Sequence, residues 1–477
     1  MKVLLVYPPR LNIVQPSLPK VAEEEQGCMP PLGLLYVAAY LQQHTDHEVV
    51  VLDTQAEKLD YQQLEQRLAE LNADIVGISV VTYLLYDAYQ VAQLAKKVNP
   101  DVHVNMGGPH LSIYPRETLG LDAVDSVTVG DGEHSFTHLV EQLASGKTGF
   151  EIPGVFLKAQ VAQASFSPDF FIKDLDSLPL PARQLIDKRL YTSVFTSGVL
   201  GTTIITSRGC PNRCIFCQLS QNKLRLRSIT NVVDEIEQCL QDGIREIDIY
   251  DDTFNITVER VIEFCEEILR RGLDFSWSFR ARVNKVSLEM LKLAKQAGCI
   301  RIQYGVESGS SKILEIMQKH ITLEQVEEAF RLTRQAGITA FAYFMLGAPG
   351  EGAAETEQTM RFVRKIKPDF VSFSVTTPWP GTTMYSQGLE KGIYSHDYWA
   401  EFAAQPVPNY QPHFWTEFYQ PEEVFQIQEK ALRQFYFRPG YLFKSIMQLR
   451  SWGDFKSKAT AGLSLFKEIF LPQGSKK

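Results

Sequence analysis

The sequence lacks any apolar run long enough to cross a membrane, which takes about 20 consecutive residues. Its first residues, MKVLLVYPPR, contain too short an apolar run for a signal peptide and lead into prolines instead of a cleavage region. Positive charge is also not in excess, because 48 Lys and Arg face 56 Asp and Glu, a formal net charge of -8. Nucleic-acid-coating proteins need clustered cations, so no nucleic-acid partner is predicted. We expect a soluble, cytoplasmic, multidomain enzyme.

Cysteines are few for 477 residues: there are seven, and three of them fall within eight residues. This is not the pattern of a secreted disulfide framework, and it indicates a reducing compartment. Cys239 and Cys265 lie in helical patterns and Cys299 begins a strand pattern, so all three are expected to be buried. Cys28 is expected in a turn. The remaining three are the candidates for chemistry: Cys210, Cys214 and Cys217.

Residues 1–145 alternate between short β-rich segments and longer helical patterns. The expected strands are KVLLVY, EVVVLD, DIVGISVV, VHVNMGG and SVTVGDG. Strands that are apolar on both faces and separated by helices indicate a parallel sheet covered on both sides. We therefore predict an α/β fold that begins with a doubly wound, Rossmann-like domain. Residues 146–195, rich in Pro and Asp, are predicted to form a linker.

A second alternating series occupies residues 196–390. Its strand patterns are TTIITS, EIDIYDD, FSWSFRARV, IRIQYGVES, TAFAYFMLG and DFVSFSVTT. Six β/α units predict a partial (β/α)6 version of the TIM-type barrel, in which ligands lie at the carboxyl ends of the strands. Residues 391–477 become aromatic and then mainly helical, and we predict a helical C-terminal region there.

The end of the chain is basic: residues 430–477 contain ten Lys or Arg residues and two acidic residues. With the aromatic segment FYFRPGYLF inside it, this tail is compatible with a position on a membrane surface. A basic solvated face of helices packed on the barrel explains the same pattern equally well. Peripheral membrane association is therefore kept as the alternative to a wholly cytoplasmic location.

The segment SRGCPNRCIFCQ places its three cysteines in C-x3-C-x2-C spacing at the end of the first barrel strand. Thiolates are the ligands of iron–sulfur clusters, and this spacing lets one loop surround a compact cluster. Three protein ligands leave one iron of a [4Fe-4S] cluster open to an external ligand. A structural zinc site normally has four protein ligands. No fourth Cys or His lies near the loop in sequence, so zinc is the disfavoured alternative.

With Phe216 just before the third cysteine, this motif resembles the signature of the radical S-adenosylmethionine (SAM) enzymes. The resemblance implies that a [4Fe-4S] cluster on Cys210, Cys214 and Cys217 reduces bound SAM. The products would be methionine and a 5′-deoxyadenosyl radical that abstracts hydrogen from an inert carbon. It also implies that adenine packs near Phe216, and that an electron donor such as ferredoxin or flavodoxin supplies the electron.

Polar or glycine-rich segments follow the later barrel strands, where the resemblance places SAM. A carboxylate such as that of Glu307 suits a ribose hydroxyl or an ammonium group. The alternative for Glu307 is a buried ion pair with Arg280 or Arg282, and the alternative for Gly347 is a turn that requires positive φ. The predicted SAM contacts are Phe216, Asp251, Asp252, Glu307 and Gly347.

Glycines and polar residues also follow the strands of the first domain, at the edge where open α/β sheets bind ligands. A dinucleotide site would show G-x-G-x-x-G after the first strand, which is absent. The segments PPLGLLYVAAYL, GGPH and GDGE, ahead of a radical SAM motif, resemble instead the cobalamin-binding domains of cobalamin-dependent radical SAM enzymes, or class B methyltransferases. The predicted cobalamin contacts are Pro9, Ser79, Thr82, Gly107, Gly108, His110, Gly130, Gly132 and Glu133.

The first domain departs from other cobalamin proteins in one respect. The D-x-H-x-x-G motif that supplies a histidine to cobalt is missing after the first strand, and Asp101-Val-His103 enters the fourth strand without the required spacing. A histidine on the lower face of cobalt is therefore not predicted. His110 is assigned either to a contact with the nucleotide tail of the cofactor or to a turn.

The resemblance implies methyl transfer, in which one SAM methylates reduced cobalamin, a second supplies the radical, and the substrate carbon takes methyl from methylcobalamin. The family also includes the anaerobic magnesium-protoporphyrin monomethyl ester cyclase, so oxidative ring closure is the alternative. Aromatic residues between Tyr410 and Tyr441 suit a large apolar substrate, such as a tetrapyrrole or an isoprenoid lipid, or else pack in a core. A non-catalytic cobalamin or redox sensor is disfavoured, because such a sensor would need no open iron. A methylthiotransferase is disfavoured, because it would need a second cysteine trio.

Overall fold

The computed structural model describes residues 1–14, 29–147, 151–160, 170–191, 199–218 and 223–441. The chain divides into two compact units. The first takes in the described residues between Met1 and Tyr191 together with Tyr394–Pro412. The second takes in those between Thr192 and Ile393 and those from His413 onward. The predicted turn at Cys28 lies outside the described residues.

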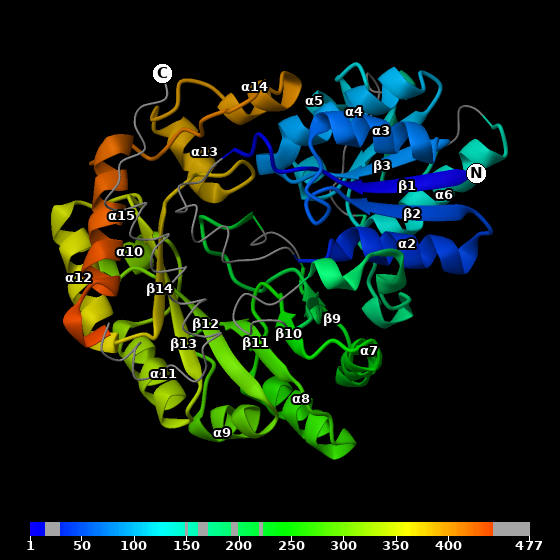
Figure 1. Cartoon of the computed structure of the whole chain (residues 1–477). Coiled ribbons are helices and arrows are strands. Elements are labelled where there is room, and N and C mark those ends of the chain that lie inside the picture. The colour runs from blue at the N-terminus through cyan, green and yellow to red at the C-terminus, as the bar shows by residue number, and fades with distance from the viewer. Residues whose placement is uncertain (15–28, 148–150, 161–169, 192–198, 219–222, 442–477) are drawn as a thin grey trace. The chain divides into compact units, whose positions relative to one another are not determined.

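The first unit is built on one sheet (Figure 1). In spatial order its strands are β2 (Glu48–Asp53), β1 (Lys2–Tyr7), β3 (Ile75–Ser79), β4 (His103–Gly107), β5 (Ser126–Thr128) and β6 (Val155–Leu157). The first five are parallel, and β6 runs antiparallel to β5. The order 2-1-3-4-5 is one of the two common doubly wound arrangements, so the predicted fold is confirmed.

Helices cover both faces of this sheet. They are α2 (Leu32–His44), α3 (Tyr61–Leu71), α4 (Leu85–Val98), α5 (Pro115–Leu119), α6 (Gly132–Ala144) and α14 (Tyr398–Ala404). Helices α2 and α6 pack together on one face, and α3 packs with α4 on the other (Figure 1). Helix α14, far along the chain, packs on α5, where the Tyr114 hydroxyl donates to Asp397 Oδ1 at 2.8 Å. A late segment of the chain therefore completes the first unit.

The second unit contains six parallel strands in the order expected for a partial barrel. They are β7 (Gly201–Ile204), β10 (Glu246–Ile249), β11 (Ser276–Ala281), β12 (Cys299–Glu307), β13 (Thr339–Leu346) and β14 (Phe370–Val375). A small antiparallel ribbon of β8 (Ser207–Arg208) and β9 (Arg225–Leu226) follows β7. Its helices are α7 (Ile229–Gln241), α8 (Val258–Arg271), α9 (Leu288–Gln296), α10 (Ser311–Ile316), α11 (Leu323–Gln335), α12 (Ala353–Ile366), α13 (Thr383–Glu390) and α15 (Pro421–Tyr436).

In strand β11, successive side chains point alternately to the two faces of this sheet. Trp277 and Phe279 stack at 5.4 Å and pack edge-to-face with Phe254 in the core under the helices. Ser278 and Arg280 must then point to the opposite, concave face, because successive strand residues alternate. The cysteines expected to be buried lie in the same core: Cys239, Cys265 and Cys299.

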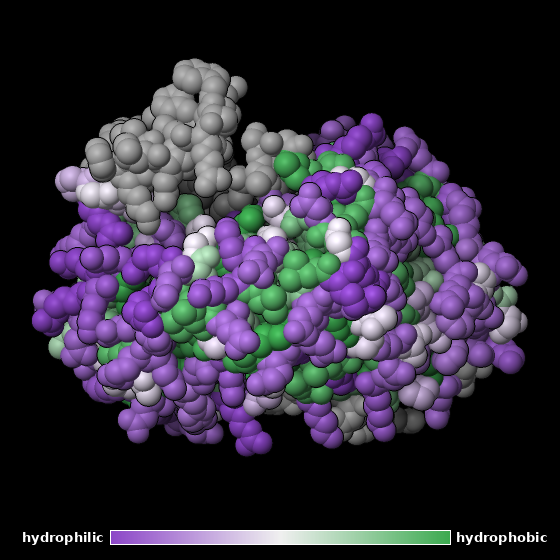
Figure 2. Space-filling view, turned by 90° about the horizontal axis from the view of Figure 1, so that it is seen from below, coloured by the Kyte–Doolittle hydropathy of each residue, from purple (hydrophilic) through white to green (hydrophobic). Residues whose placement is uncertain are grey.

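Within the described part of the chain, no helix is both long enough and apolar enough to span a membrane. The face drawn in Figure 2 is mostly hydrophilic, with hydrophobic side chains visible between the polar ones. Residues 430–441 of the predicted basic tail are described, and the Arg438 guanidinium lies 4.3 Å from the centre of the Phe435 ring. Residues 442–477 lie outside the described residues, so the membrane-surface position of the tail stays a prediction.

Candidate functional site

The three-cysteine loop follows β7 and β8 at the carboxyl edge of the barrel sheet. Cys214 is buried, while Cys210 and Cys217 are half-buried. The Asn212 amide donates to Cys210 Sγ at 3.2 Å, and the Arg282 guanidinium donates to Cys214 Sγ at 3.8 Å. Both groups are placed to donate hydrogen bonds to sulfur, and the thiolate is the form of cysteine that binds metal. The loop therefore has the chemistry of an iron–sulfur ligand set.

The arrangement also bears on the zinc alternative. Across the described ranges, no three His, Cys, Asp or Glu side chains are placed to hold one metal ion. A tetrahedral zinc site needs its ligands to converge on a single ion. In a [4Fe-4S] cluster each thiolate binds a different iron. The choice between a cluster and a zinc ion on these cysteines stays a prediction.

Segments from later β/α units hold the loop in place. The Ile215 amide donates to Met317 O at 3.1 Å, and the Met384 amide donates to Ile215 O at 2.8 Å. The Gln218 side chain donates to Pro380 O at 2.8 Å. The position of the cysteines is thus set by the chain after α10 and by the start of α13, over 100 residues away in sequence.

Phe216, the predicted adenine contact, lies half-buried between two small apolar clusters. One contains Ile215 and Met384, and the other contains Met317 and Ala348. Its ring centre is 5.7 Å from Lys319 Nζ. The residue is fixed beside the cysteines as a partly accessible aromatic surface, and its contact with adenine stays a prediction.

Asp251 points back at the strand that leads into the cysteine loop. Its buried carboxylate accepts hydrogen bonds from Thr206 N and Thr206 Oγ1, both at 2.6 Å, and from Ser207 Oγ at 2.7 Å. Burial raises the pKa of the Asp251 carboxyl, although these hydrogen bonds oppose the shift. Asp252 is exposed beside it. Of the two predicted SAM contacts, Asp252 is the one whose side chain is accessible, and Asp251 acts as an anchor.

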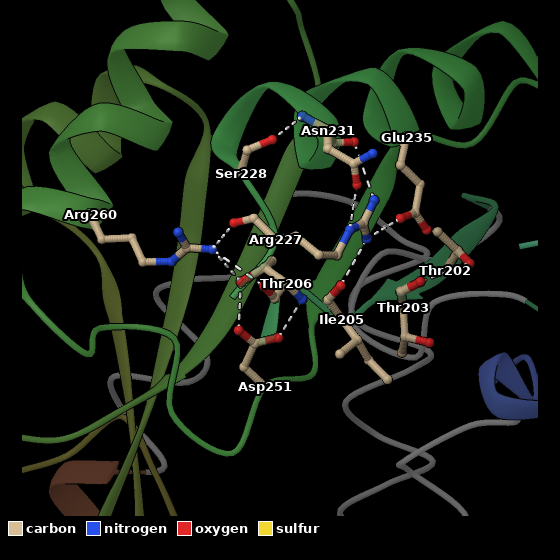
Figure 3. Close-up of polar contacts among 10 residues, drawn as sticks. All are labelled: Thr202, Thr203, Ile205, Thr206, Arg227, Ser228, Asn231, Glu235, Asp251 and Arg260. Carbon is tan, nitrogen blue, oxygen red and sulfur yellow. Dashed lines mark hydrogen bonds and ion pairs between the residues drawn. The ribbon is translucent and has the colours of Figure 1, made fainter. Parts of the chain in front are cut away.

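Two arginines complete this anchor, and sequence analysis missed both (Figure 3). Arg227 forms a buried ion pair with Glu235 and donates to Ile205 O at 2.8 Å. Arg260 donates to Thr206 Oγ1 at 3.3 Å and to Arg227 O at 3.0 Å. The only sequence signal was weak: Arg227 precedes Ser228, the N-cap of α7. Together these contacts fix residues 205–207, just before the cysteines.

Glu307 is buried in an ion pair, but the predicted partner was wrong. Lys319 Nζ, and not Arg280 or Arg282, donates to Glu307 Oε1 at 2.7 Å. Glu307 also has φ of 70°, a backbone conformation that is costly for a residue other than glycine. Strain of this kind clusters at ligand sites, so Glu307 stays a candidate SAM contact next to Lys319.

Gly347 follows β13 with φ of 74°, so the turn alternative applies to it. The turn is held by Glu351, whose carboxylate accepts from Ala348 N at 3.0 Å. Burial raises the pKa of Glu351 to about 7, although backbone hydrogen bonds from Ala348 and Gly347 oppose the shift. Glu351 was missed in the sequence, where its only signal is its position after Gly347-Ala-Pro-Gly350. A SAM contact at Gly347 stays a prediction.

In the first unit, the predicted cobalamin contacts gather at the carboxyl edge of the parallel strands. Pro9 follows β1, Ser79 ends β3, Gly107 ends β4 and Gly130 follows β5. Strand β1 pairs with both β2 and β3, so the strand order reverses beside it. Ligands of doubly wound sheets bind at such a switch point. The sheet thus brings Pro9 and Ser79 to the crevice expected to hold a ligand.

His110 lies in the short 3-10 helix Pro109–Ser112 and is 1% exposed. Its Nδ1 is 3.0 Å from Thr82 Oγ1, and its buried Nε2 has no hydrogen-bond partner among the described residues. Burial lowers the pKa of His110 to about 3, so the imidazole is neutral. An unsatisfied buried polar atom suits a polar ligand group. His103 instead begins β4, at the other edge, with Nε2 2.8 Å from Ser126 Oγ.

Two of the predicted glycines are required by the fold itself. Gly108 has φ of 106°, and a Cβ there would lie 2.8 Å from Val80 O. Gly130 has φ of 86°, and a Cβ there would lie 2.2 Å from Phe170 O. The backbone conformation and the close contacts already explain why glycine occupies these two positions. Their contacts with cobalamin therefore stay predictions. The last two predicted residues open α6: Gly132 and Glu133.

Comparison with known proteins agrees with this two-part organisation. Residues 20–140 match the B12 binding domain family, and residues 204–363 match the Radical SAM superfamily. These matches define a radical SAM enzyme in which a B12-binding domain precedes the barrel in the sequence. An uncharacterized methyltransferase of Pyrococcus horikoshii is 33% identical over 94% of this chain and 95% of its own length. The chain belongs to the family of cobalamin-dependent radical SAM enzymes.

Other relatives cover both branches of that family. The anaerobic magnesium-protoporphyrin IX monomethyl ester cyclase of Rubrivivax gelatinosus is 29% identical over 79% of this chain and 70% of its own. The radical SAM methyltransferase TsrM of Kitasatospora setae, solved with cobalamin and a [4Fe-4S] cluster, superposes with a TM-score of 0.68 at 18% identity, covering 98% and 99% of the two chains. The enzyme OxsB, solved with aqua-cobalamin and SAM, gives 0.72 at 18% identity, covering 98% and 72%. These structures confirm the fold.

Proposed function

We propose that this enzyme transfers a methyl group to an unactivated carbon of a small-molecule substrate. The observation that carries the proposal is the 33% identity to a methyltransferase over nearly the full length of both chains. The two units support it, because each presents its candidate ligand residues at the carboxyl edge of a parallel sheet. The proposed cofactors are a [4Fe-4S] cluster, SAM and cobalamin.

The residues of the second unit fit the cluster and SAM. Cys210, Cys214 and Cys217 would hold three irons, with Asn212 donating to the Cys210 sulfur and Arg282 to the Cys214 sulfur. When bound, the cluster and SAM supply the radical that removes hydrogen from carbon, and cobalamin supplies the methyl group. The role of this chain is to align the reacting groups and exclude water.

In the first unit, the neutral His110 with its unsatisfied Nε2, and the hydroxyls of Ser79 and Thr82, would contact cobalamin. Histidine coordination of cobalt is not part of the proposal. Nor does His103 offer it, because its imidazole contacts Ser126 at the opposite edge of the sheet. The proposal includes a cytoplasmic location and an electron donor such as ferredoxin or flavodoxin.

A second candidate function is oxidative cyclisation. It is favoured by the 29% identity to a magnesium-protoporphyrin monomethyl ester cyclase over 79% of this chain. The two functions differ in one product, because methyl transfer from SAM releases S-adenosylhomocysteine. A cyclase that binds cobalamin would form 5′-deoxyadenosine without it.

The test is anaerobic reconstitution of the full chain with iron, sulfide and cobalamin, followed by addition of SAM and a reductant. We expect the wild type to form 5′-deoxyadenosine and S-adenosylhomocysteine. Cys214→Ala should abolish 5′-deoxyadenosine, whereas Cys239→Ala, in the helical core of α7, should retain it. A wild type that binds zinc and forms no 5′-deoxyadenosine contradicts the proposal.

A further inference from the structure

The concave face of the barrel sheet carries a band of polar side chains that neither the cysteine loop nor the predicted SAM contacts use. On β10, Ile247 and Ile249 lie in the core, so Asp248 faces the opposite way, and Tyr250 directly after the strand continues this alternation. The same alternation places further residues on that face: Ser278 and Arg280 of β11, Arg301 and Gln303 of β12, and Tyr343 of β13. This face is therefore polar where the helix-covered face is apolar.

The members of the band are hydrogen-bonded to one another. Asp248 Oδ1 accepts from Ser278 Oγ at 2.7 Å and from Gln303 Nε2 at 3.3 Å. Gln303 Oε1 accepts from the Tyr343 hydroxyl at 2.7 Å. The carboxylate of Asp248 is thus engaged by neutral donors, and it forms no ion pair with Arg280 within 4.0 Å.

Arg280 differs from the other members of the band because its guanidinium stacks on an aromatic ring. Its guanidinium carbon lies 3.4 Å from the centre of the Tyr250 ring, and Tyr250 is 45% exposed. The arginine itself is half-buried, and among the described residues no carboxylate lies within 4.0 Å of it. Asp248 and Asp252 interact with it electrostatically from a longer distance. A guanidinium stacked on an aromatic ring keeps its in-plane donors available for a carboxylate.

We propose that Arg280 and Tyr250 bind the carboxylate of a ligand inside the barrel. Asp248 and Asp252 act on the half-buried guanidinium only from beyond ion-pair distance, and a bidentate carboxylate supplies a direct partner of matching geometry. Two ligands of the proposed reaction carry a carboxylate that could bind here. One is an acidic substrate, such as a tetrapyrrole with propionate side chains, and the other is SAM through its amino-acid carboxylate. This inference rests on the proposed function and narrows it. If the group belongs to the substrate, a neutral isoprenoid hydrocarbon is disfavoured.

The test measures affinity in the reconstituted full-length protein. SAM affinity is measured by equilibrium dialysis, and affinity for protoporphyrin IX and for its dimethyl ester by fluorescence titration. The variants are Arg280→Gln, Arg280→Lys and Tyr250→Ala. The matched control is Arg331→Gln, an exposed arginine of α11 that pairs with Glu328. Circular dichroism and iron content are recorded for each variant.

If the substrate supplies the carboxylate, Arg280→Gln weakens binding of the free acid by about tenfold or more. Affinities for the dimethyl ester and for SAM then stay unchanged, and Arg280→Lys gives a smaller loss because it keeps the charge but not the fork of donors. If SAM supplies it, SAM affinity falls instead and the acid and ester behave alike. In either case Tyr250→Ala, a change at an exposed position, weakens the binding of the same ligand that Arg280→Gln affects.

The proposal is overturned if Arg280→Gln, folded and loaded with iron, matches the wild type in its affinity for the acid, the ester and SAM. Failure of the proposed function has a different signature. It would appear as the absence of 5′-deoxyadenosine in the wild type, a result that does not depend on which ligand Arg280 binds.

Discussion

Lys319 and Glu307 form a buried ion pair beside the cysteine loop, with Lys319 Nζ 2.7 Å from Glu307 Oε1 and both side chains about nine-tenths buried. The same segment of chain supports the loop directly, because Met317 O accepts from the Ile215 amide. Lys319 O in turn accepts from Arg282, the arginine that contacts Cys214 Sγ. The pair therefore links a predicted SAM contact to the geometry of the predicted cluster ligands.

Glu307→Gln is expected to leave the Lys319 ammonium buried without a counter-ion. Removing one partner of a buried pair costs roughly 3–5 kcal/mol, so the free energy of unfolding in denaturant should fall by an amount of that order. The control is Glu328→Gln, which breaks an exposed pair with Arg331 and should cost about 0.5 kcal/mol or less. Equal losses in the two variants would contradict the structural role of the pair, and unchanged SAM affinity in Glu307→Gln would contradict the predicted SAM contact.

Asp251→Asn is expected to loosen the strand that enters the cysteine loop. An amide has a single acceptor oxygen, so it cannot accept from Thr206 N, Thr206 Oγ1 and Ser207 Oγ as the carboxylate does. We expect a loss of roughly 1–3 kcal/mol in stability and less iron per chain after reconstitution. The neighbouring and exposed Asp252→Asn serves as control, and iron loading that falls equally in both variants would argue against an anchoring role for Asp251.

His110 should make the first unit sensitive to acid. Its pKa is lowered to about 3 from an ordinary 6.5, so below 6.5 the unfolded chain binds a proton that the folded chain does not. The free energy of unfolding therefore falls by several kcal/mol as the pH drops from about 6.5 towards 3, and is unaffected by this group above that range. Acid unfolding of the wild type and of His110→Gln, followed by circular dichroism, measures the difference.

The same variant tests the cofactor prediction. If His110 contacts cobalamin, His110→Gln should retain less cobalamin per chain with iron content unchanged. Loss of stability with full cobalamin retention would assign His110 to the turn alone.

Glu351 should give the second unit the opposite pH dependence to that of His110, because its folded form becomes less stable as the pH rises. Its pKa is raised to about 7 from 4.5, so between these values the folded chain holds a proton that the unfolded chain has lost. The free energy of unfolding therefore decreases by roughly 3 kcal/mol as the pH rises through that window. Glu351→Gln is neutral throughout and should lack this slope. Denaturant unfolding of both proteins between pH 5 and 8 checks the sign, and parallel curves would show that Glu351 is ionised in the folded state.

Strand and helix patterns were readable from the sequence because they depend on neighbouring residues. The apolar segments KVLLVY and EVVVLD become the paired strands β1 and β2, and the six later patterns become six neighbouring parallel strands. The antiparallel strand β6 was missed because it lies in the Pro- and Asp-rich segment 146–195, which was interpreted as a linker. The return of Tyr394–Pro412 to the first unit was also missed, since it depends on contacts with residues nearly 300 positions earlier, such as that of Asp397 with Tyr114.

The sequence by itself determined the order of the domains, the class of each sheet and the three cysteines on one loop, since spacing and periodicity act over a few residues. Only the tertiary structure decided which groups meet. It paired Glu307 with Lys319, turned Asp251 toward Thr206, and stacked Arg280 on Tyr250 with no carboxylate within ion-pair distance among the described residues. Glu307 and Lys319 meet through the loops around α10, and the other two pairs join different β/α units. Their distances follow from strand register and loop geometry, which no local pattern encodes.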